Sequence, residues 1–219
     1  MGRITAIVPQ KRKKDRSNIF LEGEFAFGLG GEAVFLNKLK TGKELTEEEV
    51  KKLIEADQVE RLVEKIVRYL GFRPRSEKEV RDHLTFKGKL KDLKTEEEKR
   101  QYIGSIEKAL ERVRKLGYLD DTEFAKWWVG QRESFRKTSK RVLQSELFKK
   151  GISKAVMQEV LGKGISEESK AQALVEKKIK LLKKLSKAEM RIKLGQYLAR
   201  AGFDWILIKK VVDSTLQNI

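Results

Sequence analysis

The chain has 219 residues, of which 39% are hydrophobic, so it is long enough to bury one or more packed cores. It contains no cysteine and a single histidine, His83, which excludes disulfide frameworks and sites built on thiolate or several histidine ligands. Fifty lysines and arginines against 33 acidic residues leave a net charge of +17, which favours nucleic acid, or an acidic protein bound to it, as a partner.

Targeting and membrane signals are lacking in this sequence. The charged N-terminal stretch is not followed by an apolar segment, and no run approaches the roughly 18 apolar residues of a membrane span. We therefore expect a cytoplasmic protein that does not bind a membrane.

Residues 1–45 are predicted to form a small N-terminal β unit. Ile4, Ala6 and Val8 alternate with polar neighbours, and Gly23 separates two short apolar runs, a pattern typical of an antiparallel hairpin. The two predicted strands are separated by a basic run made of Lys11, Arg12, Lys13, Lys14 and Arg16. The glycines at 28, 30 and 31 are predicted to form a turn after the hairpin.

From Thr46 onward the apolar period is helical. Helix starts are marked by an oxygen-bearing residue followed three positions later by Glu, the pattern of a capping box. The pairs are Thr46 with Glu49, Ser76 with Glu79, Thr95 with Glu98, Asp120 with Glu123, and Ser186 with Glu189. Further starts are predicted near Ser139, Ser153 and Ser166. This spacing indicates many short helices rather than one coiled coil.

Three segments align without gaps on a glycine, which indicates internal repeats. They end at Gly88, Gly151 and Gly202, where a helix commonly takes a left-handed residue. Two apolar rows coincide in this register: Val80 with Leu143 and Leu194, and, four residues later, Leu84 with Leu147 and Leu198. Because residues four apart share one helical face, both rows are predicted to lie in the core.

The sequence thus predicts three tandem three-helix repeats, over residues 46–119, 120–164 and 165–219. Their first helices are predicted over Glu55–Leu70, Asp121–Phe135 and Glu167–Leu185. A charged insertion after Gly88 delays the third helix of the first repeat to about Ile103. The fold class is therefore mainly α, preceded by the β-hairpin unit.

Candidates for chemistry are few. Asp120 and Asp121 are adjacent carboxylates at a helix start, where a cap and a charge that stabilises the helix dipole explain both. His83 lies between core rows and is predicted to be structural. No grouping of residues meets the geometric roles that catalysis requires. We expect a protein that is not an enzyme, with no cofactor and no metal.

Basic clusters with neighbouring aromatic residues are the strongest positive signal after the repeats. Trp128 is predicted in the core of the middle repeat, while Trp127 is either partly buried or free to stack on a base. The middle cluster comprises Arg132, Arg136, Lys137, Lys140 and Arg141, and a third-repeat cluster comprises Lys177, Lys178, Lys180, Lys183, Lys184, Lys187, Arg191 and Lys193. Such clusters are typical of phosphate contacts with little sequence preference.

Four segments, in this order, resemble the RecX regulatory family: GEFAFGL, RPRSEKEVRDHL, LGYLDDTEFAKWWVGQR and SELFKKGI. The resemblance implies an elongated, curved protein of tandem three-helix repeats that binds the RecA recombinase filament on single-stranded DNA. It further implies a regulator of recombination, DNA repair and the SOS response that lowers ATP hydrolysis and strand exchange. The N-terminal β unit is not present in all relatives, and the charged insertion after Gly88 departs from the compact repeat of the family. We expect the chain to act as a monomer.

A basic loop before a helix start occurs twice, as RPRS and as RKTS. We therefore expect the two loops to line one concave face toward RecA and DNA. The residues assigned to binding are Arg73, Arg75, Trp127, Arg132, Arg136, Lys137, Lys140 and Arg141, together with Lys11, Arg12, Lys13 and Lys14. Two other hypotheses remain open: a sequence-tolerant basic DNA-binding protein, and a helical scaffold for an unrelated protein.

Overall fold

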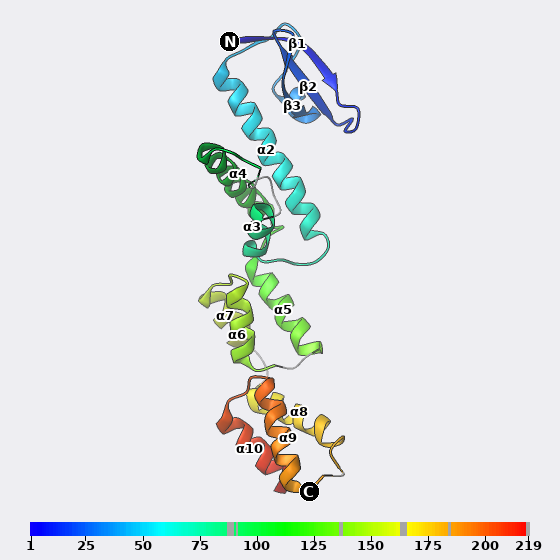
Figure 1. Cartoon of the computed structure of the whole chain (residues 1–219), viewed down its shortest axis with the longest axis vertical. Coiled ribbons are helices and arrows are strands. Elements are labelled where there is room, and N and C mark those ends of the chain that lie inside the picture. The colour runs from blue at the N-terminus through cyan, green and yellow to red at the C-terminus, as the bar shows by residue number, and fades with distance from the viewer. Residues whose placement is uncertain (87–89, 91, 136–137, 163–165, 184, 218–219) are drawn as a thin grey trace. The chain divides into compact units, whose positions relative to one another are not determined.

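The computed structural model describes residues 1–86, 90, 92–135, 138–162, 166–183 and 185–217 (Figure 1). The chain forms two compact units. One consists of Met1–Phe72 with Val80–Tyr118, and the other of Arg73–Glu79 with Leu119–Ile219. None of the helices in the described residues is long and apolar enough to cross a membrane. The repeat boundaries after residues 45, 119 and 164 stay a prediction.

The N-terminal β unit is a four-stranded antiparallel sheet. Its order is β3-β2-β1-β4, so the predicted hairpin is present and is extended on both sides. The elements are β1 (Gly2–Pro9), β2 (Arg16–Leu21), β3 (Glu24–Gly30), a short helix α1 (Gly31–Leu36) and β4 (Glu44–Leu45). The turn predicted at the glycines of 28–31 is wrong, because Gly28 and Gly30 lie in β3 and Gly31 begins α1.

Arg16 belongs to the fold of this unit rather than to an exposed basic run. Its guanidinium makes two hydrogen bonds to Asp57, at 2.9 and 2.7 Å, and a third to the carbonyl oxygen of Gly28. The Gly30 amide also donates to Asp57, at 3.0 Å. Both charged side chains are nearly buried, so the pair fixes β2 and β3 onto the helix that carries Asp57.

Three helices follow the sheet: α2 (Glu47–Leu70), α3 (Glu77–Phe86) and α4 (Glu96–Lys115). The predicted capping boxes at Thr46 and Thr95 are confirmed. Two predicted starts are wrong. The first helix begins at Glu47 rather than Glu55, because the capping box at Thr46 starts it directly. The third begins at Glu96 rather than near Ile103, because the capping box at Thr95 starts it within the charged insertion. Helices α2 and α4 pack against each other.

Six further helices follow in the described residues after 119: α5 (Asp121–Phe135), α6 (Lys140–Lys149), α7 (Lys154–Gly162), α8 (Glu167–Ile179), α9 (Lys187–Arg200) and α10 (Trp205–Gln217). The predicted span of α5 is confirmed. Helix α8 ends at Ile179 rather than Leu185, because the chain tightens into turns there and Leu182 folds back into the core. The caps at Ser139, Ser153, Ser166 and Ser186 are all present.

The two apolar rows found by internal alignment are confirmed as core. Val80, Leu84, Leu147, Leu194 and Leu198 are 0% exposed, and Leu143 is 1% exposed. The left-handed glycines are confirmed at Gly151, with φ +83°, and at Gly202, with φ +86°. Gly88 lies outside the described residues. The rows therefore mark the second helix of each repeat, α3, α6 and α9, as its buried centre.

Successive repeats are joined by the same polar contact at two places. The amide of Glu77, at the start of α3, donates to Oδ1 of Asp121 at 2.8 Å, and the amide of Lys140, at the start of α6, donates to Oε1 of Glu167 at 2.8 Å. Asp121 and Glu167 each begin the first helix of the next repeat. A carboxylate at a helix N-terminus stabilises that end, so each acidic residue serves two helices at once.

Candidate functional site

The candidate site is built around two adjacent tryptophans on α5. Trp127 and Trp128 are both half-buried and pack on the core of the middle repeat, and the ring of Phe124 lies 5.9 Å from each of theirs. Of the two arrangements expected for Trp127, partial burial is the one that the structure confirms. Trp128, predicted as core, is only partly buried, and its indole Nε1 donates to Glu146 at 2.8 Å.

Charged side chains surround both tryptophans, and we call the whole group the tryptophan cluster. It comprises Trp127, Trp128, Arg73, Glu79, Arg132, Glu146 and Lys150. All seven residues lie in the second compact unit. Three cations face two carboxylates, which leaves one positive charge in excess.

Glu79 is the acidic centre of one half of the cluster. Arg73 donates to both of its carboxylate oxygens, at 3.0 and 3.1 Å, and Lys150 donates to Oε1 at 2.6 Å. Burial by itself would raise the pKa of Glu79, but the hydrogen bonds from Arg73 and Lys150 outweigh it and lower the pKa to about 2. Ser76 caps α3 by accepting from the Glu79 amide, but the reciprocal half of the predicted capping box is wrong, because the carboxylate is engaged elsewhere.

Glu146 is the acidic centre of the other half. It accepts from Arg132 Nε at 2.8 Å as well as from Trp128. The Arg132 guanidinium lies 4.8 Å from the Trp128 ring centroid and Lys150 Nζ lies 5.0 Å from it, while Arg73 lies 5.7 Å from Trp127. Cations within about 6 Å of an aromatic face are attracted to it. Side chains of the protein itself therefore already cover part of both tryptophan rings.

The predicted binding residues fall into two groups by exposure. Arg73, Trp127 and Arg132 are held within the tryptophan cluster, and Arg75 is half-buried beside it in sequence. Lys140 and Arg141 are exposed in the first turn of α6. Arg136 and Lys137 lie outside the described residues.

The N-terminal basic residues belong to the other compact unit. They are exposed in the loop between β1 and β2, as predicted, and comprise Lys11, Arg12, Lys13 and Lys14. The loop is anchored at its base, where the Gln10 amide donates to the Arg16 carbonyl oxygen at 2.8 Å. Four cations thus project from a short connection whose ends are fixed by the sheet.

Sequence reasoning missed Lys150, Glu79 and Glu146 as members of the site. Glu79 was explained as a cap partner, and Lys150 stands next to a glycine used only to set the repeat register. The available signal was the spacing of Trp128 and Arg132, which places both on one face of α5 toward the next helix. In the described residues no group of three or more His, Cys, Asp and Glu is placed to hold a metal ion.

Four family models match the chain in order. They describe the RecX N-terminal domain, over residues 2–46, and the first, second and third three-helix domains of RecX, over residues 63–89, 120–161 and 166–212. Curated proteins named Regulatory protein RecX also match. That of Bacillus licheniformis is 35% identical over 220 residues, which cover 98% of this chain and 78% of the relative.

Other relatives match over a shorter length. The Regulatory protein RecX of Clostridium beijerinckii is 34% identical over 129 residues, which cover 59% of this chain and 55% of the relative. The Regulatory protein RecX of Listeria monocytogenes is 31% identical over 127 residues, which cover 58% of this chain and 43% of the relative. This chain therefore spans about half the length of these two relatives.

Two solved structures share the fold. A crystal structure of regulatory protein RecX superposes with a TM-score of 0.70 at 24% identity, covering 97% of this chain and all of the other. The crystal structure of RecX from Lactobacillus salivarius superposes with a TM-score of 0.57 at 24% identity, covering 75% of this chain and 99% of the other.

Proposed function

The chain belongs to the RecX family of regulatory proteins, and from that premise we propose that it regulates homologous recombination and DNA repair by binding the RecA filament on single-stranded DNA. Bound there, it inhibits ATP hydrolysis and strand exchange by RecA. The observation that carries the proposal is the ordered match of all four RecX domains along one chain. The mode of action is binding by surface area and charge, without a bond made or broken.

The surface we assign to the filament is the basic end of the middle repeat. Exposed Lys140 and Arg141, with Arg136 and Lys137 before them in sequence, contact phosphates or acidic side chains of the filament. Arg73, Arg75, Trp127 and Arg132 form the wall beside them. The contacts of the tryptophan cluster support this assignment, because they hold the wall rigid, so that little binding free energy is lost in ordering it.

The loop between β1 and β2 is a second contact in this proposal. Its four exposed cations, Lys11, Arg12, Lys13 and Lys14, are suited to a polyanion and have no groups set to distinguish bases. We assign this loop to non-specific contact with DNA or with acidic side chains of RecA. The chain acts as a monomer in the cytoplasm.

The test is ATP hydrolysis by RecA on single-stranded DNA, titrated with this protein, beside its direct binding to the same DNA without RecA. We expect hydrolysis to fall at protein concentrations too low to coat the naked DNA. If hydrolysis falls only when the DNA is saturated, the chain is a sequence-tolerant basic DNA-binding protein. If hydrolysis does not fall at all, regulation of RecA by this chain is contradicted.

A further inference from the structure

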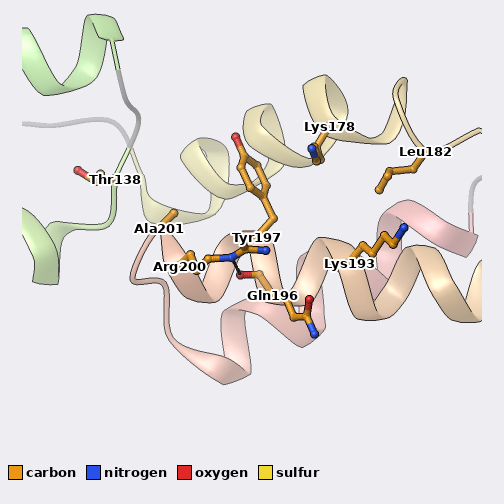
Figure 2. Close-up of a pocket in the computed structure, with 8 residues that line it drawn as sticks. All are labelled: Thr138, Lys178, Leu182, Lys193, Gln196, Tyr197, Arg200 and Ala201. Atoms are coloured by element: carbon orange, nitrogen blue, oxygen red, sulfur yellow. Dashed lines mark hydrogen bonds between the residues drawn. The ribbon is translucent and has the colours of Figure 1, made fainter.

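A cavity with a volume of about 590 Å³ lies between α8 and α9 in the third repeat (Figure 2). Its volume falls within the roughly 300–1,000 Å³ that small-ligand sites occupy. Three of its lining residues are cations: Lys178 from α8, and Lys193 and Arg200 from α9. Within the described part of the chain, no carboxylate lines it. The cavity therefore has the charge of an anion site.

One face of α9 supplies most of the wall. Lys193, Gln196, Tyr197 and Arg200 occupy positions i, i+3, i+4 and i+7, which places them in one stripe along the helix. Figure 2 shows Tyr197 reaching from this stripe toward α8, which carries Lys178. The Lys178 ammonium lies 5.6 Å from the Tyr197 ring centroid. Charged and hydrogen-bonding groups from two helices thus converge on one space.

The cations of this cavity differ from those of the tryptophan cluster. Among the described residues, none of the three forms an ion pair with a carboxylate, whereas Arg73, Arg132 and Lys150 are all paired. Glu189, one turn before Lys193, is engaged with the cap residue Ser186 instead. Like charges that line one cavity repel each other, and a bound anion relieves that repulsion.

A buried hydroxyl supplies an independent observation. Thr138 also lines the cavity and is only 8% exposed. Its Oγ1 is buried and has no hydrogen-bond partner in the described part of the chain. Buried polar atoms without a partner are rare in folded proteins because they lose their hydrogen bonds to water. An oxygen of a bound anion is a suitable acceptor for this hydroxyl.

We propose that this cavity binds successive backbone phosphates of a single-stranded nucleic acid. Lys178, Lys193 and Arg200 each pair with oxygens of one phosphate, the Thr138 hydroxyl donates to the phosphate nearest to it, and the Gln196 amide donates to an adjoining sugar or base. The choice of a strand as ligand rests on the proposed function, but the site does not require RecA. The three cations of this site lie on α8 and α9, whereas Thr138 belongs to the loop of the middle-repeat surface assigned to the filament.

The first experiment measures binding of a fluorescent oligothymidylate by anisotropy over a series of salt concentrations. The variant replaces Lys178, Lys193 and Arg200 by Gln, and a matched control replaces Lys154, Lys187 and Lys209, which are exposed and do not line the cavity. Both lose three positive charges. Removing three phosphate contacts lowers the slope of log affinity against log salt by about 2 and the affinity by more than about tenfold. Equal losses in the two variants would overturn the proposal.

A second variant separates binding from folding. Thr138→Val removes the unpartnered hydroxyl and keeps the shape of the side chain. We expect the free protein to be as stable as the unchanged one, or more stable, while affinity for the oligothymidylate falls. Lower stability together with unchanged affinity would show that the hydroxyl serves the fold, and would contradict its place in the site.

Two further comparisons separate this proposal from its alternatives. If the cavity holds a strand, inorganic phosphate competes only weakly with the oligothymidylate. If phosphate binds in the cavity but the cavity variant binds the strand as tightly as the unchanged chain, the ligand is a free phosphate compound and the proposal is wrong. Filament inhibition is measured separately with RecA. A chain that fails to inhibit RecA but loses strand binding in the cavity variant contradicts the proposed function and leaves this site standing.

Discussion

Glutamates three residues after a helix cap have different roles in this chain. Glu49 bonds back to the Thr46 amide at 2.8 Å, and that bond lowers its pKa. Glu79 occupies the same position after Ser76, but its carboxylate binds Arg73 and Lys150. The difference arises because Glu79 is half-buried within the tryptophan cluster, where two cations reach it, whereas Glu49 faces solvent. A sequence pattern identifies the cap, and the surroundings decide where the carboxylate goes.

We predict that Glu79→Gln destabilises the unit that contains the tryptophan cluster. The Glu79 pKa of about 2 in the folded chain, against an ordinary 4.5, corresponds to at most about 3 kcal/mol at neutral pH, which screening by solvent reduces to about 1–2 kcal/mol. Because the folded-state pKa is lowered, this contribution is complete above about pH 5 and is lost as the pH falls from 4.5 toward 2. Urea denaturation followed by tryptophan fluorescence measures it, since all three tryptophans lie in this unit.

Glu123→Gln is the matched control for this prediction. Glu123 also pairs with a lysine, Lys126, but its side chain is 68% exposed. Exposed pairs contribute little, so we expect a change within about 0.5 kcal/mol. A difference between Glu79→Gln and the unchanged chain that stays constant from pH 7 to below pH 3 would show that the loss is one of packing and not of charge.

At the scale of elements, the glycines that end α6 and α9 have two functions. Each adopts a left-handed conformation that terminates its helix, and each lets the start of the preceding repeat's second helix approach closely. A Cβ at Gly151 would lie 2.7 Å from Cβ of Lys78. At Gly202 the corresponding neighbours are Ser139 and Val142. The glycine that sets the repeat register is therefore also the point of contact between repeats.

We predict that Gly202→Ala costs far more stability than Gly117→Ala. Both glycines have positive φ, +86° and +75°, so both variants carry the same backbone strain of about 1–2 kcal/mol. The alanine methyl at position 117 would have no neighbouring atom within 4 Å, whereas at position 202 the methyl would overlap Val142 and lie 2.8 Å from Ser139 Oγ. That overlap adds about 1–3 kcal/mol.

Urea denaturation followed by circular dichroism at 222 nm, a wavelength typical of helix, measures both variants. The Ser139 amide, which donates to the Ala201 carbonyl oxygen at 3.0 Å, gives a second probe. Loss of this hydrogen bond in Gly202→Ala speeds the hydrogen exchange of that amide. If both variants lose the same free energy of unfolding, the contact between repeats rearranges to accommodate the methyl group without strain.

At the scale of the whole molecule, the +17 charge is distributed between paired and unpaired positions. Cations such as Arg16, Arg73 and Arg132 are used inside the fold, where carboxylates neutralise them. Lys140 and Arg141, by contrast, are exposed and form no ion pair within the described residues. In the proposed interface, cations of the second kind supply the electrostatic part of binding, because they have counterions to release.

We predict that Arg136→Glu with Arg141→Glu abolishes inhibition of RecA and leaves helicity unchanged. Reversed charge on the assigned surface repels phosphates and acidic side chains, while an acidic residue in the first turn of α6 suits the helix dipole. ATP hydrolysis by RecA and circular dichroism measure the two effects. The control is Lys154→Glu with Lys209→Glu, which changes the net charge equally on other exposed positions. Full inhibition by the first variant would remove these residues from the interface.

Local patterns in the sequence by themselves determined the helical repeats of this protein. Caps, apolar rows and left-handed glycines depend on interactions within a few residues, so the roles of Ser139, Leu147 and Gly202 follow from their sequence neighbours alone. The same locality explains the span of α5. A four-stranded sheet was not predicted, because pairing of the two-residue strand β4 with β1 joins segments far apart in sequence.

Only the tertiary structure decided which charged residues are neutralised within the fold. Arg16 and Arg141 have the same chemistry and both belong to basic runs of the sequence, but Asp57 lies against the first and no carboxylate pairs with the second in the described chain. The tryptophan cluster and the cavity beside α9 arise in the same way, from side chains on separate helices. Charge neutralisation is a property of three-dimensional neighbours, and sequence spacing does not contain it.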